Sequence, residues 1–151
     1  MMRFASPQAL LDIIADHKRG RPHGIYSVCS ANSYVLEASV RQAAQYDLPL
    51  LIEATCNQVN QYGGYTGMSP RDFARYVAQI AEEMHVSPNR IILGGDHLGP
   101  NPWQDEPTQS AMAKARQMVT DFVQAGFVKI HLDASMRCAD DDRTPPRRRE
   151  S

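Results

Sequence analysis

Residues 90–98 combine an apolar segment with side chains that can do chemistry. Three aliphatic residues run into Gly94 and Gly95, and Asp96 and His97 follow directly. A neutral imidazole binds divalent metal ions and a carboxylate moves protons, so a metal ion held here could polarise a carbonyl and stabilise an enediolate. The same Asp-His pair could instead simply cap a loop. The two glycines would let a backbone or a ligand approach closely.

A second carboxylate stands inside another apolar segment. Glu53 lies within residues 48–55, and Asn57 follows two residues after that segment. A buried carboxylate costs free energy unless it is paired, so Glu53 requires a partner. The loop 57–67 contains several Asn and Gln side chains and two tyrosines beside glycines. These donors could bind a polyol or a phosphate group, or they could hydrogen-bond within the loop itself.

Three polar residues alternate in segment 127–135. Lys129, His131 and Asp133 are two residues apart, so they share one face of an extended strand. Lys129 could neutralise Glu53 or Asp133, or it could take part in catalysis. For His131 we favour a buried position in the core, with its ring nitrogens hydrogen-bonded.

Regular elements must position these residues, and the sequence predicts an alternating set of helices and strands. Helices are expected over 6–20, 33–46, 69–84 and 108–126, and strands over 24–30, 48–55, 90–95 and 127–135. The third helix carries the strongest signal. Ser69 can cap its start, Pro70 can occupy its first position, and apolar residues then recur every three or four positions.

This alternation indicates an α/β fold with a parallel sheet, because parallel neighbours need helical crossovers. A doubly wound open sheet and part of a (β/α)8 barrel both satisfy the pattern. No G-x-G-x-x-G motif follows the first strand, which argues against a dinucleotide site. In either architecture ligands bind at the carboxyl ends of the strands, and the polar residues gather at those ends.

The four predicted strands limit how much of a barrel this sequence can form. A complete barrel typically needs about 250 residues, so we expect residues 1–137 to form only the N-terminal half of one. Residues 138–151 contain no large apolar side chain and are rich in arginine and proline. This segment is interpreted either as a disordered tail or as the non-native end of a truncated or out-of-frame chain. We favour the second interpretation.

Composition excludes several classes of function. Sixteen basic and seventeen acidic residues give a net charge of -1, so nucleic acid and membrane are not expected as partners. No apolar run approaches the ~20 residues that span a bilayer, and the N-terminus does not read as a signal peptide. The odd number of cysteines fits reduced thiols in the cytoplasm. We expect Cys29 and Cys56 to be small core residues.

Four long segments in a fixed order carry a resemblance to a known family: "GIYSVCSANSYVLEA", "LIEATCNQVNQYGGYTGM", "RIILGGDHLGPNPW" and "GFVKIHLDASMRCADD". They closely resemble the accessory, Z-type subunit of D-tagatose-1,6-bisphosphate aldolase, the GatZ/KbaZ family. The resemblance extends to about Cys138. Members of that family are (β/α)8 barrels and much longer chains, so the resemblance implies the barrel and an N-terminal fragment of it.

The resemblance also implies a function. The aldolase splits tagatose 1,6-bisphosphate into dihydroxyacetone phosphate and glyceraldehyde 3-phosphate in galactitol or N-acetylgalactosamine catabolism. A separate, zinc-dependent Y-type subunit is catalytic, and the Z-type subunit supports its activity and stability. The family has also been labelled a tagatose-6-phosphate kinase, but the sequence contains no P-loop glycine motif.

Residue roles follow from the family's similarity in layout to class II aldolases. Asp96 would be the catalytic acid or base, and His97 would be a Zn²⁺ ligand. Independently of that similarity, Glu53, Asn57 and Asp133 are expected to contact the substrate, a phosphorylated ketohexose, because they lie at or near the carboxyl ends of the predicted strands. The remaining zinc ligands would come from later strands. Two functions stay open, namely a non-catalytic subunit that binds the Y-type chain and, in the full-length form, a metal-dependent aldolase or epimerase.

Overall fold

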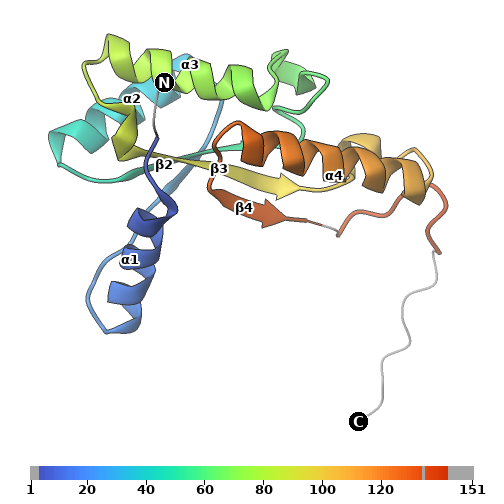
Figure 1. The fold of residues 1–151 in the computed structure, drawn as a ribbon, viewed down its shortest axis with the longest axis horizontal. Helices are drawn as coiled ribbons and strands as arrows, with labels where there is room; N and C mark the ends of the chain where they lie inside the picture. Colours follow the sequence, from blue (N-terminus) through green and yellow to red (C-terminus); the bar gives the residue numbers. More distant parts are fainter. Residues whose placement is uncertain (1–3, 134, 143–151) are drawn as a thin grey trace.

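The chain alternates between helices and strands, as a computed structural model describes for residues 4–133 and 135–142 (Figure 1). Each helix and strand expected from the sequence is present, and the bounds differ by a few residues. The elements are α1 Pro7–Lys18, β1 Ser27–Cys29, α2 Ser33–Gln45, β2 Leu50–Thr55, α3 Pro70–Glu83, β3 Ile91–Leu98, α4 Thr108–Gln124 and β4 Lys129–Leu132. Short 3-10 turns lie at Gly64–Thr66, Pro88–Arg90 and Asn101–Trp103.

The four strands form one parallel sheet in the order β1-β2-β3-β4. Spatial order therefore follows chain order, as it does in successive units of a (β/α)8 barrel. The α/β class with a parallel sheet is confirmed, and the sheet is consistent with part of such a barrel.

Helices α2, α3 and α4 cover one face of this sheet (Figure 1). Ile52 of β2 and Leu93 of β3 belong to the same buried cluster as Phe73 of α3 and Phe122 of α4. Because side chains alternate along a strand, the residues between these apolar ones project from the opposite face. That opposite face carries the polar residues of β2, β3 and β4.

Helix α3 forms as its sequence predicts. The Ser69 side chain accepts a hydrogen bond from the Asp72 backbone N–H, and the Asp72 carboxylate accepts one from the Ser69 backbone N–H at 3.1 Å. Pro70 follows at the first position, where no backbone donor is needed. This reciprocal cap satisfies two backbone donors at the start of the helix.

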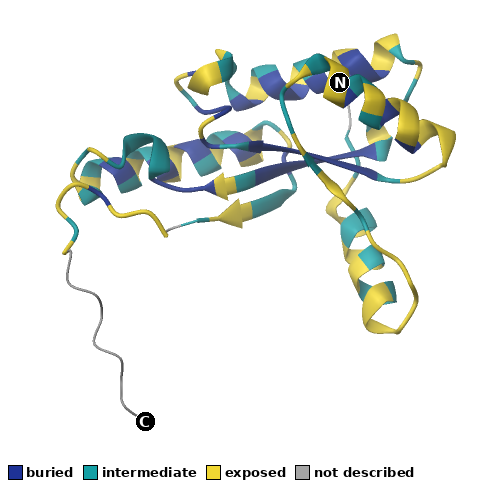
Figure 2. Ribbon diagram, turned by 180° about the vertical axis from the view of Figure 1, so that it is seen from behind, coloured by how far each residue is buried: buried dark blue, intermediate teal, exposed yellow. Residues whose placement is uncertain are grey.

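Helix α1 stands apart from the helical layer. None of its residues is buried, and Figure 2 shows it as intermediate and exposed throughout. Leu11 is 55% exposed and Ile14 is 43% exposed, so the described residues leave part of its apolar side uncovered. The chain just before it is anchored, since the Ala5 backbone N–H donates to the Ile91 carbonyl at 2.9 Å. Among the described helices, α1 included, none is long and apolar enough to cross a membrane.

Residues 138–142 lie against the start of α4. The Ala139 backbone N–H donates to the Glu106 carbonyl at 3.1 Å, and the Asp140 carboxylate accepts from the Thr108 backbone N–H at 2.6 Å. Cys138 is buried. Residues 143–151 lie outside the described residues, so the boundary at residue 137 and the origin of segment 138–151 stay predictions.

Candidate functional site

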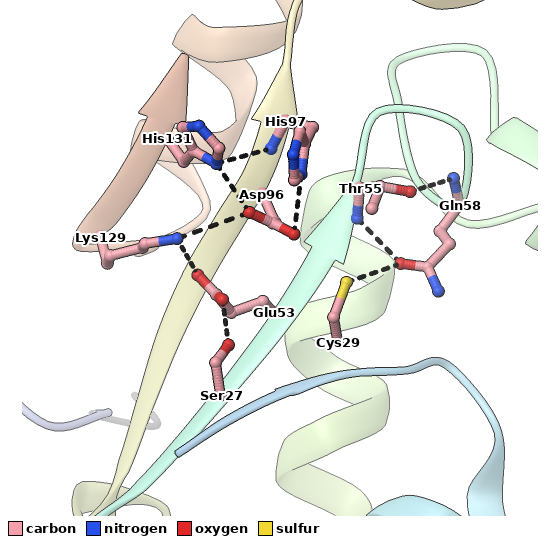
Figure 3. A network of polar contacts seen from close by, with 9 residues as sticks. All are labelled: Ser27, Cys29, Glu53, Thr55, Gln58, Asp96, His97, Lys129 and His131. Atoms are coloured by element: carbon pink, nitrogen blue, oxygen red, sulfur yellow. Dashed lines mark hydrogen bonds and ion pairs between the residues drawn. The ribbon is translucent and has the colours of Figure 1, made fainter. Parts of the chain in front are cut away.

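Glu53 lies at the centre of the polar face and is only 4% exposed. Ser27 Oγ donates a hydrogen bond to its Oε2, and the Lys129 ammonium forms an ion pair with its Oε1 (Figure 3). Among the described residues no other donor reaches Oε1, so the Lys129 ammonium compensates its charge. A buried carboxylate without such compensation would be strongly destabilising. Of the two roles expected for Lys129, the structure therefore supports neutralisation of Glu53.

Gly94 makes room for this carboxylate. Strand pairing places Gly94 beside Glu53 on one side and Lys129 on the other. A β-carbon at Gly94 would lie 2.5 Å from Glu53 Oε1 and 2.9 Å from its Cγ. We expected a backbone or a ligand to need this space, but a neighbouring side chain occupies it.

Asp96 lies between two imidazole rings near the carboxyl end of β3. Its Oδ1 is 2.8 Å from His131 Nδ1, and its Oδ2 is 3.0 Å from His97 Nδ1 (Figure 3). Lys129 Nζ lies 3.7 Å from Oδ1. Partial burial raises the pKa of Asp96, but the hydrogen bonds from His131 and His97 and the nearby positive charge outweigh burial and lower that pKa to about 2. Asp96 is therefore ionised at neutral pH.

A β-bulge explains how the side chains of the consecutive residues Asp96 and His97 both lie beside His131. Asp96 and His97 would face opposite sides of a regular strand. The His97 backbone has a φ of 50°, and the register of β3 against β4 shifts between Gly95 and Leu98. The bulge redirects the side chain, as bulges beside functional sites often do. The ring centroids of His97 and His131 are consequently 4.4 Å apart.

The structure brings together part of the predicted set. Glu53, Asp96 and His97 belong to the network in Figure 3. The Asp133 carboxylate accepts a hydrogen bond from the Ser135 backbone N–H at 2.8 Å, and hydrogen bonding by the Ser135 side chain, then by this backbone group, lowers its pKa. Asn57 is exposed in the loop that follows β2. The substrate-binding roles of Glu53, Asn57 and Asp133 stay predictions.

Two expectations about burial were wrong. His131, expected in the core, has a side chain that is 44% exposed and contacts Asp96. Cys29, also expected in the core, is exposed on the edge strand β1, whereas Cys56 is buried as expected. Partial burial and the negative charge of Asp96 raise the pKa of the Cys29 thiol to about 11, so this thiol is protonated at neutral pH. The shared alternation of His131 with Lys129 was the signal that could have placed His131 in the network.

The amide-rich loop after β2 is bonded largely within itself. The Asn60 side chain donates to the Cys56 carbonyl at 2.9 Å and accepts from the Tyr62 and Gly64 backbone N–H groups at 2.9 and 3.2 Å. Gln58 accepts from the Thr55 backbone N–H at 2.8 Å. Both amides are buried. Of the two interpretations of this loop, the internal one accounts for these side chains.

The outer part of the network contains donors that suit a metal ion. One ligand atom each from Asp96, His97 and His131 lies within 4.8 Å of the others. Two imidazole nitrogens and a carboxylate oxygen resemble the three protein ligands of a catalytic zinc site, which keeps one position open. The His97 side chain is 56% exposed, so solvent reaches the group. These residues fit a divalent ion such as zinc.

A solved structure and a family model both match this chain. A crystal structure of a probable tagatose 6 phosphate kinase from Sinorhizobium meliloti 1021 matches it with 55% sequence identity and a TM-score of 0.77. The match covers 79% of this chain and 31% of that one, so this chain spans about a third of the solved protein. The family model for the D-tagatose-1,6-bisphosphate aldolase subunit GatZ/KbaZ-like matches residues 10–149. The chain therefore belongs to the GatZ/KbaZ-like family of D-tagatose-1,6-bisphosphate aldolase subunits.

Proposed function

We propose that this chain is part of a non-catalytic accessory subunit of class II tagatose-1,6-bisphosphate aldolase. It binds the separate, zinc-dependent Y-type subunit and raises the activity and stability of that subunit. The reaction served is the cleavage of tagatose 1,6-bisphosphate in cytoplasmic galactitol or N-acetylgalactosamine catabolism. The observation that carries this proposal is the family match over residues 10–149, because that family is described as an aldolase subunit.

The state of Asp96 supports an accessory role over independent catalysis. A general base works best when its pKa lies near the working pH. The pKa of Asp96 is lowered to about 2, largely because two imidazoles hold its ionised form, so this carboxylate is a weak base at neutral pH. The buried carboxylate of Glu53 is engaged by Ser27 and Lys129. Neither group is poised to remove a proton from a sugar phosphate.

A second candidate function is a metal-dependent aldolase or epimerase acting on phosphorylated ketohexoses in a full-length form. The observation that favours it is the donor group Asp96, His97 and His131. A bound zinc ion would supply electrophilic polarisation of a carbonyl. Lys129 would then position the Asp96 carboxylate, which lies 3.7 Å from its ammonium group. A kinase function is not proposed, because the sequence has no P-loop motif for phosphate.

The test mixes the purified chain with a catalytic Y-type subunit. Cleavage of tagatose 1,6-bisphosphate and the Tm of the Y-type subunit are measured with and without the chain. The Sinorhizobium meliloti protein, a longer relative with 55% identity, is included for comparison. We expect the chain to raise both the rate and the Tm, and to cleave nothing by itself.

The variant His97→Ala separates the two candidate functions. An accessory subunit should stimulate the Y-type subunit equally well with or without this side chain. A metal-dependent enzyme should show cleavage or epimerisation by itself and should lose it in His97→Ala. If the chain neither binds nor stimulates the Y-type subunit, the accessory proposal is wrong.

A further inference from the structure

We propose that Asp96, His97 and His131 form a complete three-ligand zinc site, in which His131 supplies the ligand that would otherwise have to come from a later strand. All three residues lie on the adjacent strands β3 and β4 of this chain. The site is independent of the accessory role, since it needs no residue of a partner.

The spacing of the donor atoms matches a zinc site. Bonds of about 2.0–2.1 Å in a tetrahedral arrangement put neighbouring ligand atoms about 3.3–3.4 Å apart. The two Asp96 oxygens lie 2.8 Å from His131 Nδ1 and 3.0 Å from His97 Nδ1. One ligand atom from each of the three residues lies within 4.8 Å of the others, so the donor atoms need to shift by at most about 1.5 Å to surround one ion.

The charges around the group also favour a cation. Lys129 is the one cationic side chain in the described network, and its ammonium forms an ion pair with Glu53. Glu53 thus balances that charge, and the Asp96 carboxylate adds a negative charge beside the two imidazoles. A divalent cation is attracted by this arrangement.

The donor types select among metals. Mg²⁺ and Ca²⁺ prefer sites made of oxygen ligands, whereas imidazole suits zinc and other late first-row metals. The exposed fractions of the His97 and His131 side chains, 56% and 44%, leave room for water as a fourth ligand. The site is therefore expected to bind Zn²⁺, and to bind Co²⁺ as its spectroscopic substitute.

The first experiment measures Zn²⁺ binding to the purified chain by equilibrium dialysis and by calorimetry. We expect one ion per chain. Each of Asp96→Asn, His97→Ala and His131→Ala should weaken binding by more than 10-fold, since even outer partners of metal ligands contribute about 10–100-fold. His17→Ala is the matched control, because His17 is exposed on the separate helix α1. That variant should bind zinc as the unaltered chain does.

A second experiment asks whether residue 131 touches the metal, even if His131→Ala folds poorly. In His131→Cys loaded with Co²⁺, a thiolate ligand should add a sulfur-to-cobalt charge-transfer band in the near ultraviolet, which the unaltered chain should lack. Absence of zinc binding by the unaltered chain overturns the proposal, and so does equal affinity in His131→Ala or cobalt binding to His131→Cys without the new band. Stimulation of the Y-type subunit is scored separately, so loss of one result leaves the other interpretable.

Discussion

Two neighbouring regions of the polar sheet face share Lys129 but differ in environment. In the inner region, the Glu53 side chain is 5% exposed and is enclosed by Ser27 and Lys129. In the outer region, His97 and His131 are about half-exposed around Asp96. Charges interact more strongly when water is excluded. The inner region therefore stabilises the sheet, whereas the outer region remains accessible to a ligand.

The largest expected effect tests the inner region. Glu53→Ala should lower the free energy of unfolding by about 3 kcal/mol, because it removes the nearer of the two carboxylates that pair with the part-buried Lys129 ammonium. Urea unfolding measures this loss. The double variant Glu53→Leu with Lys129→Met should recover much of it, because an apolar pair can replace a buried ion pair. If the double variant is as unstable as the single one, the ion pair is not what stabilises this region.

The space beside Glu53 gives the next prediction. Gly94→Ala should cost about 1–3 kcal/mol, because its methyl group would overlap the Glu53 side chain. Gly24→Ala is the control, since a β-carbon there meets nothing within 4 Å. Urea unfolding of both variants under the same conditions makes the comparison. Equal stability of the two variants would contradict the packing described for Gly94.

The stability that Asp96 contributes in the outer region should depend on pH. The folded-state pKa of Asp96 is about 2, below its ordinary value of 3.8, so ionisation of Asp96 stabilises the folded chain. This stabilisation, at most about 2 kcal/mol, is fully present above pH 3.8 and is lost as the pH falls through about 2. We expect the stability difference between the unaltered chain and Asp96→Asn to shrink across that range. A difference that stays constant with pH would argue against the two imidazole contacts.

The smallest effect on stability is expected for His97→Ala. Exposed substitutions usually change the free energy of unfolding by about 0.5 kcal/mol or less, and the His97 side chain is 56% exposed. Added Zn²⁺ should raise the Tm of the unaltered chain by mass action, but not that of His97→Ala. Differential scanning calorimetry with and without zinc checks both statements. A large loss of stability without metal would place His97 among the structural residues instead.

Local signals predicted the elements well and their packing less well. The Ser69 cap formed as expected, because its atoms lie within four residues of sequence. The helical period of α1 was read correctly, but the described residues leave Leu11 and Ile14 exposed. Periodicity states which side of a helix is apolar and says nothing about what that side meets.

In the candidate site, too, local patterns predicted which residues take part but not how they pack. Glu53 and Asp96 were identified from acids embedded in apolar strands, and alternation put Lys129 and His131 on one face. The exposure of His131 was missed, because it depends on which elements cover the end of the sheet. The role of Gly94 was also missed, since the atom that fills its space belongs to another strand.

The sequence by itself determined the alternating α/β order and the set of polar residues that face away from the helices, because side-chain periodicity is a property of neighbouring residues. The tertiary structure alone decided that Asp96, His97 and His131 meet. That meeting requires a particular register between β3 and β4 and a bulge at His97. Pairing between strands is set by contacts that are distant in sequence, so no local pattern contains it.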